Sequence, residues 1–193
     1  MFDDRTDAGE QLAERLREAG VEADLVLAIP RGALPVARPV ADALGVPLDI
    51  VAAKKMGAPN NPEYAIGAAA SDGSFWRNEE AIESLGVSED YVESERERAA
   101  ATAREKEETY REGEGASVAG KRVLLVDDGV ATGATMTASL RRLRNAGAAS
   151  VVIAVPVGPP STLDRLREEA DAVVAIKEPG SFRAVGQFYR RFD

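Results

Sequence analysis

The sequence of 193 residues contains neither cysteine nor histidine. Without cysteine it can form no disulfide, no thiolate nucleophile and no cysteine-bound metal site. Without histidine it lacks Ser-His-Asp catalysis, imidazole acid–base chemistry and histidine metal ligands. The groups left for chemistry are carboxylates, hydroxyls, Lys and Arg side chains, backbone amides and hard cations.

Positive charge is also scarce, because 24 Lys and Arg residues face 33 Asp and Glu residues and the formal net charge is −9. Such a surface repels nucleic-acid phosphates and anionic lipids, so we expect neither nucleic acid nor a membrane as partner. The apolar runs are far shorter than a bilayer span, and residues 1–10 show no basic, apolar leader. We therefore expect a cytoplasmic protein.

Short apolar runs alternate with amphipathic segments, which predicts βαβ units and an α/β fold in one domain, residues 1–193. We predict a doubly wound, five-stranded parallel sheet in the order 2-1-3-4-5, which brings the carboxyl ends of its first and third strands together. A core at about 20–55 and 118–177 is expected to carry a small hood or flexible insertion at about 56–117. The aromatic tail at 178–193 is expected to fold back on the body. The predicted strands are 25–29, 48–53, 122–126, 150–155 and 172–176.

The most informative segment runs from Val123 to Thr135, where a buried strand leads into two adjacent carboxylates, Asp127 and Asp128. The loop that follows is made of small and hydroxylated residues and opens a helix, so its amides and the helix N-terminus favour an anion. Two carboxylates beside a phosphate cradle fit a sugar phosphate, whose vicinal hydroxyls the carboxylates can bind. The alternative is a capped strand–helix turn without a ligand. The predicted cradle residues are Gly129, Val130, Ala131, Thr132, Gly133, Ala134 and Thr135.

This segment resembles the 5-phosphoribosyl-1-pyrophosphate (PRPP) signature of the type I phosphoribosyltransferases, and the wider sequence is similar to a bacterial and archaeal branch of that family. The resemblance implies that Asp127 and Asp128 bind the ribose 2′- and 3′-hydroxyls and that the loop holds the 5′-phosphate. Residues Ile29 to Ala33 resemble the pyrophosphate loop of the family, in which the Arg31 side chain and the Gly32 backbone would hold phosphate oxygens. Read by itself, that segment also fits a plain turn with a surface arginine.

Lys54 and Lys55 end the second predicted strand, and in an acidic protein they suggest neutralisation of a diphosphate. Side chains alternate along a strand, so we expect only one of them, Lys55, to reach the site, as a third catalytic residue beside the two aspartates. A solvated strand end is the alternative. The carboxylate of Glu63 is a candidate general base, as is the substrate itself. Candidates for stacking on a base are Tyr64, Phe75, Trp76, Phe188 and Tyr189, with packing inside the hood as their alternative role.

The resemblance implies an enzyme that displaces pyrophosphate from PRPP with a nitrogenous base or amine and depends on Mg²⁺, which PRPP itself carries without a direct protein ligand set. Ala131 stands where relatives acting on 6-oxopurines have an acidic residue, which argues against that acceptor class. A homodimer is the expectation for the family. Two alternatives remain: a regulator that binds PRPP or a nucleotide without catalysis, and an enzyme that processes nucleotides on the same fold.

Overall fold

The main sheet has the predicted architecture. The computed structural model describes residues 1–111 and 113–193. Its five parallel strands follow the order β2-β1-β6-β7-β8, which is the predicted 2-1-3-4-5 arrangement. β1 and β6 pair from Leu25↔Val123 to Ala28↔Val126, so both strands end at the same edge of the sheet. The strands are β1 (Leu25–Ala28), β2 (Leu48–Ile50), β6 (Arg122–Val126), β7 (Ser150–Val157) and β8 (Ala172–Lys177).

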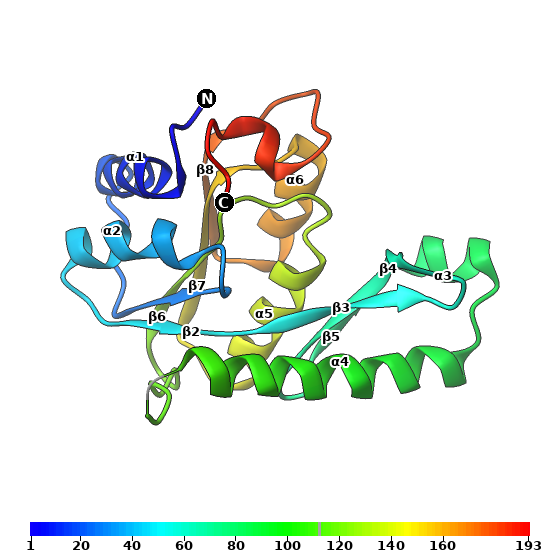
Figure 1. Ribbon diagram of the computed structural model, residues 1–193. Helices are drawn as coiled ribbons and strands as arrows, with labels where there is room; N and C mark the ends of the chain where they lie inside the picture. The colour runs from blue at the N-terminus through cyan, green and yellow to red at the C-terminus, as the bar shows by residue number, and fades with distance from the viewer. Residues whose placement is uncertain (112) are drawn as a thin grey trace.

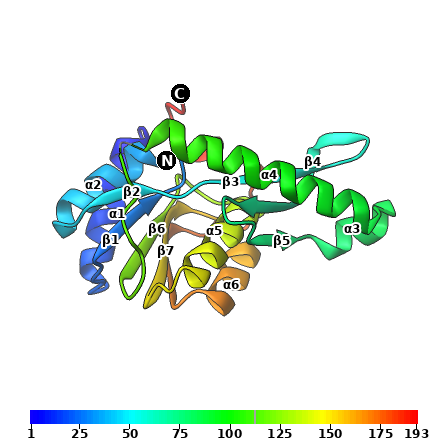
Figure 2. The same ribbon diagram turned by 90° about the horizontal axis from the view of Figure 1, so that it is seen from below.

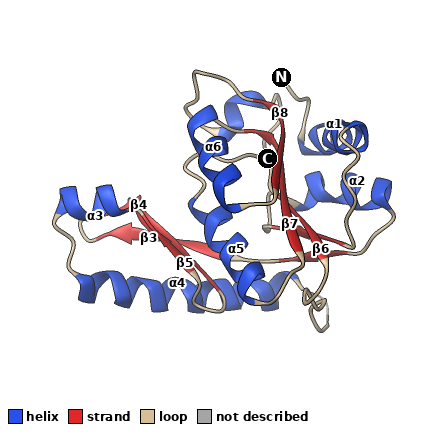
Figure 3. Cartoon of the chain, turned by 180° about the vertical axis from the view of Figure 1, so that it is seen from behind, coloured by secondary structure: helices blue, strands red, loops and turns tan. Residues whose placement is uncertain are grey.

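Helices cover both faces of this sheet (Figures 1 and 3). α1 (Arg5–Glu18) and α2 (Leu34–Leu44) lie on one face, and α5 (Ala134–Asn145) and α6 (Pro160–Glu169) lie on the other. Every residue of β1 is buried, as is expected of a parallel strand with a helix layer on each side. The apolar runs of the sequence are therefore core strands.

The hood, defined here as Ala53–Tyr110, forms a second lobe beside the main sheet (Figure 1). Its strands β3 (Ala53–Ala58), β4 (Asn61–Ala70) and β5 (Phe75–Arg77) make an antiparallel sheet, followed by α3 (Glu79–Leu85) and α4 (Glu89–Tyr110). α4 runs along one face of the hood (Figure 2). On the other face, Ala134 and Ala138 of α5 pack against alanines of β3 and β4. α5 thus supports both sheets.

One predicted strand is wrong in its extent. The run expected at 48–53 ends at Ile50, and the chain enters the hood sheet at Ala53. Lys54 and Lys55 consequently pair with Ala69 and Ala68 of β4 and do not end a strand of the main sheet. The apolar stretch 51–53 suits either sheet, so the sequence pattern does not mark where the strand leaves one sheet for the other.

The segment after β8 folds back on the body as predicted. It contains the short helix η1 (Val185–Phe188), and Tyr189 forms a bridge with Phe2, its ring centroid 5.3 Å from that of Phe2. Residue 2 and residues 189–191 therefore lie together (Figure 1). None of the helices in the described ranges is both long and apolar enough to pass through a bilayer.

The contact between α1 and α2 generates a stability prediction. A Cβ atom at Gly9 would lie 2.4 Å from the backbone oxygen of Val36, so the two helix backbones approach too closely for a side chain. Gly→Ala inside an exposed helix normally stabilises by about 1 kcal/mol, but overpacking costs about 1–3 kcal/mol. We expect Gly9→Ala to lower the free energy of unfolding in urea titrations. Gly180→Ala, where a Cβ meets nothing within 4 Å, is the control and should leave it unchanged.

Candidate functional site

The acid pair lies where β6 ends, beside the end of β1. Asp127 and Asp128 are both half-buried, and the Asp128 amide donates to the Asp127 carboxylate over 2.8 Å. Gly32 of the β1–α2 loop lies against them, because a Cβ there would be 2.6 Å from a carboxylate oxygen of Asp128. Only glycine therefore lets this loop approach the acid pair so closely.

Residues far away in the sequence hold Asp128 in place. The Arg5 guanidinium donates to its carboxylate over 3.0 Å, with both side chains less than one-fifth exposed. The Tyr189 hydroxyl donates to its backbone oxygen over 2.6 Å. Burial and the negative charge of Asp128 raise the pKa of the Tyr189 phenol. α1 and the returning tail thus orient the second carboxylate.

The two carboxylates have different surroundings. Burial above all, and then the adjacent charge of Asp128, raise the pKa of Asp127 well above the ordinary value of an aspartate. Asp128 has the nearby cation of Arg5, whereas the hydrogen bond that Asp127 receives comes from a neutral amide. The site therefore holds one carboxylate in an ion pair and one that resists ionisation.

A cavity of about 950 Å³ opens over the acid pair. It brings together Asp127 and Asp128, the loop residues Pro30 to Gly32, and Thr135 at the start of α5. Arg31 is exposed and lines it, as predicted from the sequence. The peptide bond between Pro30 and Arg31 is cis. Ala131 and Thr132 are exposed in the adjacent loop, and Thr135 at the end of that loop lines the same cavity as Pro30 to Gly32.

Four residues that sequence reasoning missed also line this cavity: Arg5, Lys106, Tyr110 and Phe192. Lys106 lies on α4, and burial together with the charge of Lys54 lowers the pKa of its ammonium group. In the sequence it stands within a run of charged residues, and nothing local distinguishes it. Arg5 and Phe192 come from the two ends of the described chain and pack together, the guanidinium 3.9 Å from the ring centroid.

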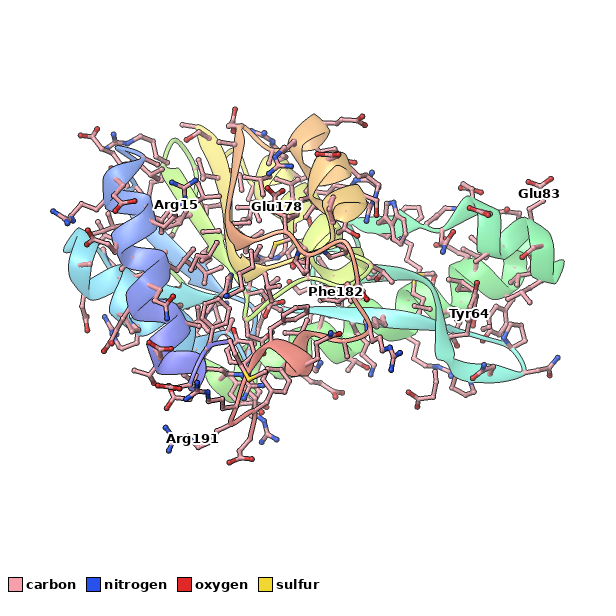
Figure 4. The ribbon with its side chains drawn as sticks, turned by 90° about the horizontal axis from the view of Figure 1, so that it is seen from above. Arg15, Tyr64, Glu83, Glu178, Phe182 and Arg191 are labelled. Atoms are coloured by element: carbon pink, nitrogen blue, oxygen red, sulfur yellow. The ribbon has the colours of Figure 1, made fainter. Side chains whose placement is uncertain are left out.

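Other predicted residues lie elsewhere. Lys54, Lys55 and Glu63 line a separate cavity of about 520 Å³ in the hood, so the structure does not bring Lys55 into the cavity above the acid pair. Its catalytic role stays a prediction. Tyr64 lies on β4 in the hood and is exposed (Figure 4). Of the predicted aromatic residues, Tyr189 makes a direct contact with the acid pair, through its hydroxyl.

The loop from Gly129 to Gly133 packs closely against Val157 and Val185. A Cβ at Gly129 would meet Val185 at 2.6 Å, and the Val130 amide donates to the Val157 oxygen over 3.0 Å. Gly133 has φ +78°, a left-handed conformation that favours glycine, and it precedes the first turn of α5. The small residues of the loop thus serve both its conformation and its close packing.

These features agree with what comparison with known proteins shows. The model of the phosphoribosyl transferase domain family matches residues 3–192, and the chain belongs to this family. A Mycobacterium tuberculosis protein that bears the family's name, phosphoribosyl transferase, is 39% identical over the whole chain. The chain spans only 44% of the length of that relative.

Solved structures show the same fold. The crystal structure of TT1426 from Thermus thermophilus has a TM-score of 0.80 and 43% sequence identity, covering 100% of this chain and 91% of that one. A hypoxanthine phosphoribosyltransferase from Staphylococcus aureus has a TM-score of 0.50 at 15% identity, with 92% of this chain and 74% of that chain covered. This second likeness concerns the fold alone. The doubly wound sheet with its small antiparallel hood sheet is the fold of the type I phosphoribosyltransferases.

The raised pKa of Asp127 leads to a prediction about stability and pH. A carboxyl group whose pKa is higher in the folded state than in the unfolded state stabilises the fold when protonated, and this contribution is lost as pH rises from the unfolded value of about 4 through the folded value. We therefore expect Asp127→Asn to raise the urea midpoint at pH 7, and the gain to shrink as the pH falls towards 4.

Asp128→Asn is the comparison variant, because Asp128 has Arg5 as its ionic partner. It should not stabilise at pH 7. If the two substitutions change the urea midpoint alike at every pH, the different surroundings that we assign to the two carboxylates are wrong.

Proposed function

We propose that this protein transfers the 5-phosphoribosyl group of PRPP to a nitrogen nucleophile, a base or an amine, with release of pyrophosphate. The observation that carries the proposal is one cavity lined by the acid pair, by Pro30 to Gly32 and by Thr135, the last residue of the predicted phosphate loop, in a chain that belongs to the phosphoribosyl transferase family. A diol, a 5′-phosphate and a diphosphate each have a matching group there.

Each part of PRPP has a proposed place. The ribose 2′- and 3′-hydroxyls would donate to the carboxylates of Asp127 and Asp128. The 5′-phosphate would lie on the loop amides and the N-terminus of α5, whose dipole favours an anion. The pyrophosphate would lie at Pro30 to Gly32, with Arg31 as a charged donor.

The reaction is a substitution at C1 of the ribose. The bond from C1 to the pyrophosphate oxygen breaks, a bond from C1 to the acceptor nitrogen forms, and the proton of the acceptor passes to the released pyrophosphate. The protein's part is to position the two reactants and to stabilise the charge that moves onto the leaving group. Carboxylates bound to the 2′- and 3′-hydroxyls would add negative charge near the ribose ring, which favours an oxocarbenium-like state.

Mg²⁺ fits this site through the substrate. Carboxylate oxygens are ligands that Mg²⁺ accepts, but the described residues do not gather three acidic side chains into a metal-binding group. When bound with PRPP, the ion would neutralise part of the pyrophosphate charge. We propose that oxygens of PRPP and water would hold the ion, with Asp127 and Asp128 as nearby carboxylates that are not its direct ligands.

The acceptor proposal is limited by Ala131. Its side chain is a methyl group, and its backbone oxygen accepts a hydrogen bond from Thr162, so this position offers a base no carboxylate. A 6-oxopurine bound through an acidic residue at this place is therefore disfavoured. Tyr110 and Phe192, exposed at the rim of the cavity, are surfaces on which a planar acceptor could rest.

The assignment of the acid pair can be tested by calorimetry. We expect Asp127→Asn combined with Asp128→Asn to abolish PRPP binding, because the diol loses both carboxyl groups, and to leave the circular dichroism spectrum of the fold unchanged. Asp164→Asn, on the exposed side of α6, should bind PRPP as the unaltered protein does. Unchanged PRPP affinity in the double variant would exclude this placement of the ribose.

Turnover separates the enzyme from a regulator. Pyrophosphate release should be steady when PRPP, Mg²⁺ and a panel of bases and amines are present, and it should stop in the double variant. Tight PRPP binding with no release across a broad panel would instead favour a non-catalytic PRPP-binding regulator.

Lys106 provides a third test. Its ammonium group is half-buried in the cavity, near Lys54, and would be stabilised by a polyanion. We expect Lys106→Gln to weaken inhibition by pyrophosphate roughly tenfold, the effect of losing one charge-assisted contact. Lys121→Gln is the matched control, because Lys121 does not line the cavity. Equal inhibition constants for the two variants would remove Lys106 from the pyrophosphate site.

A further inference from the structure

Side chains of α6 donate hydrogen bonds to the backbone oxygens of the loop that we propose holds the 5′-phosphate. The Thr162 hydroxyl donates to the Ala131 backbone oxygen over 2.7 Å, and the Arg165 guanidinium donates to the Thr132 backbone oxygen. The next backbone oxygen, that of Gly133, accepts from the Thr137 hydroxyl over 2.7 Å. Three consecutive carbonyl groups of the loop are thus held by side chains on α5 and α6.

Fixing these oxygens also fixes the amides. In a trans peptide the N–H points opposite to the C=O, so holding the oxygens of residues 131–133 turns the amides of residues 132–134 the other way, where the Ala134 amide donates to the Thr132 hydroxyl over 3.4 Å. Gly133 shows how close the contact is: a Cβ there would be 2.9 Å from both Arg165 Nη2 and Thr162 Cγ2. The position of α6 therefore contributes to the orientation of this loop.

Arg165 is itself held by the hood. Its guanidinium carbon lies 4.6 Å from the ring centroid of Trp76 on β5, and a second nitrogen donates to the Thr137 hydroxyl over 3.1 Å. Within the described ranges it forms no ion pair with a carboxylate, whereas Arg167 on the same helix pairs with Asp164 and Glu178. Burial lowers the pKa of Arg165, yet an arginine remains a cation. Its donors are directed instead to the oxygens of Thr132 and Thr137.

We infer that Arg165 is a positioning residue for the 5′-phosphate, and that Trp76 makes the phosphate affinity depend on the placement of the hood. The inference rests on the proposed function and deepens it. Arg165 would orient the loop amides towards the anion without touching it, and the hood would thereby influence phosphate binding through one stacked side chain.

Two probes distinguish this role from general stabilisation. Ribose 5-phosphate needs the loop, whereas pyrophosphate needs only the Arg31 side of the cavity. We expect Arg165→Ala to weaken ribose 5-phosphate binding at least tenfold in calorimetry and to leave pyrophosphate binding unchanged. Arg165→Lys keeps the charge but cannot donate to Thr132 and Thr137 through two guanidinium nitrogens. Its affinity for ribose 5-phosphate should lie between those of the unaltered protein and Arg165→Ala. Arg167→Ala is the control and should bind both probes normally.

The sequence holds one tryptophan, so intrinsic fluorescence reports on Trp76 alone. Ribose 5-phosphate should change this emission in the unaltered protein and in Arg167→Ala, but not in Arg165→Ala. Trp76→Leu should weaken ribose 5-phosphate binding two- to fivefold, and the milder Trp76→Phe less, since a ring under the guanidinium is kept.

The outcomes are separable. If the unaltered protein binds neither ribose 5-phosphate nor PRPP, the proposed function fails and this inference with it. If it binds them and Arg165→Ala binds ribose 5-phosphate equally well, the positioning role is wrong while the proposed function stands. An equal loss for ribose 5-phosphate and pyrophosphate would show a general structural role. Unchanged ribose 5-phosphate affinity in both Trp76 variants would exclude the coupling to the hood.

Discussion

The site depends on keeping two adjacent carboxylates at the end of a buried strand. Like charges so close together repel, and burial increases the cost of ionising both. The structure meets this constraint by giving the two groups different surroundings: Arg5 pairs with Asp128, and Asp127 takes a hydrogen bond from the next amide. The approach of Gly32 to the acid pair and the fixed position of Tyr189 both follow from where these carboxylates lie.

α5 is the helix that contacts both the main sheet and the hood sheet. It begins at the proposed phosphate loop, packs on the main sheet, and presents Ala134 and Ala138 to the hood sheet. Small side chains at these positions let the hood strands lie directly on the helix. A shift of the hood would therefore move the beginning of α5, where the loop amides are oriented, as well as the rim of the cavity.

The sequence allowed the main sheet, its order and the acid pair to be predicted, because each depends on a short local pattern. The segment from Val123 to Thr135 carries strand, loop and helix start without interruption. Arg5, Lys106 and Arg165 could not be found in this way, since their roles come from tertiary contacts. Arg5 is 123 residues away from Asp128. The strand that carries Lys54 and Lys55 is wrongly predicted for the same reason, because the apolar pattern does not show that the chain changes from the main sheet to the hood sheet at Ala53.

The contacts of Asp128 also have a consequence for the order of folding. A nascent chain can form β1 and β6 before residue 189 has been synthesised, but the hydroxyl that fixes the Asp128 backbone oxygen comes 61 residues later. Arg5, the ionic partner of the Asp128 carboxylate, is synthesised 123 residues before Asp128. Contacts between residues so distant in sequence form slowly because a long loop must close first. The acid pair would therefore gain its final electrostatic environment late, after the sheet around it has formed.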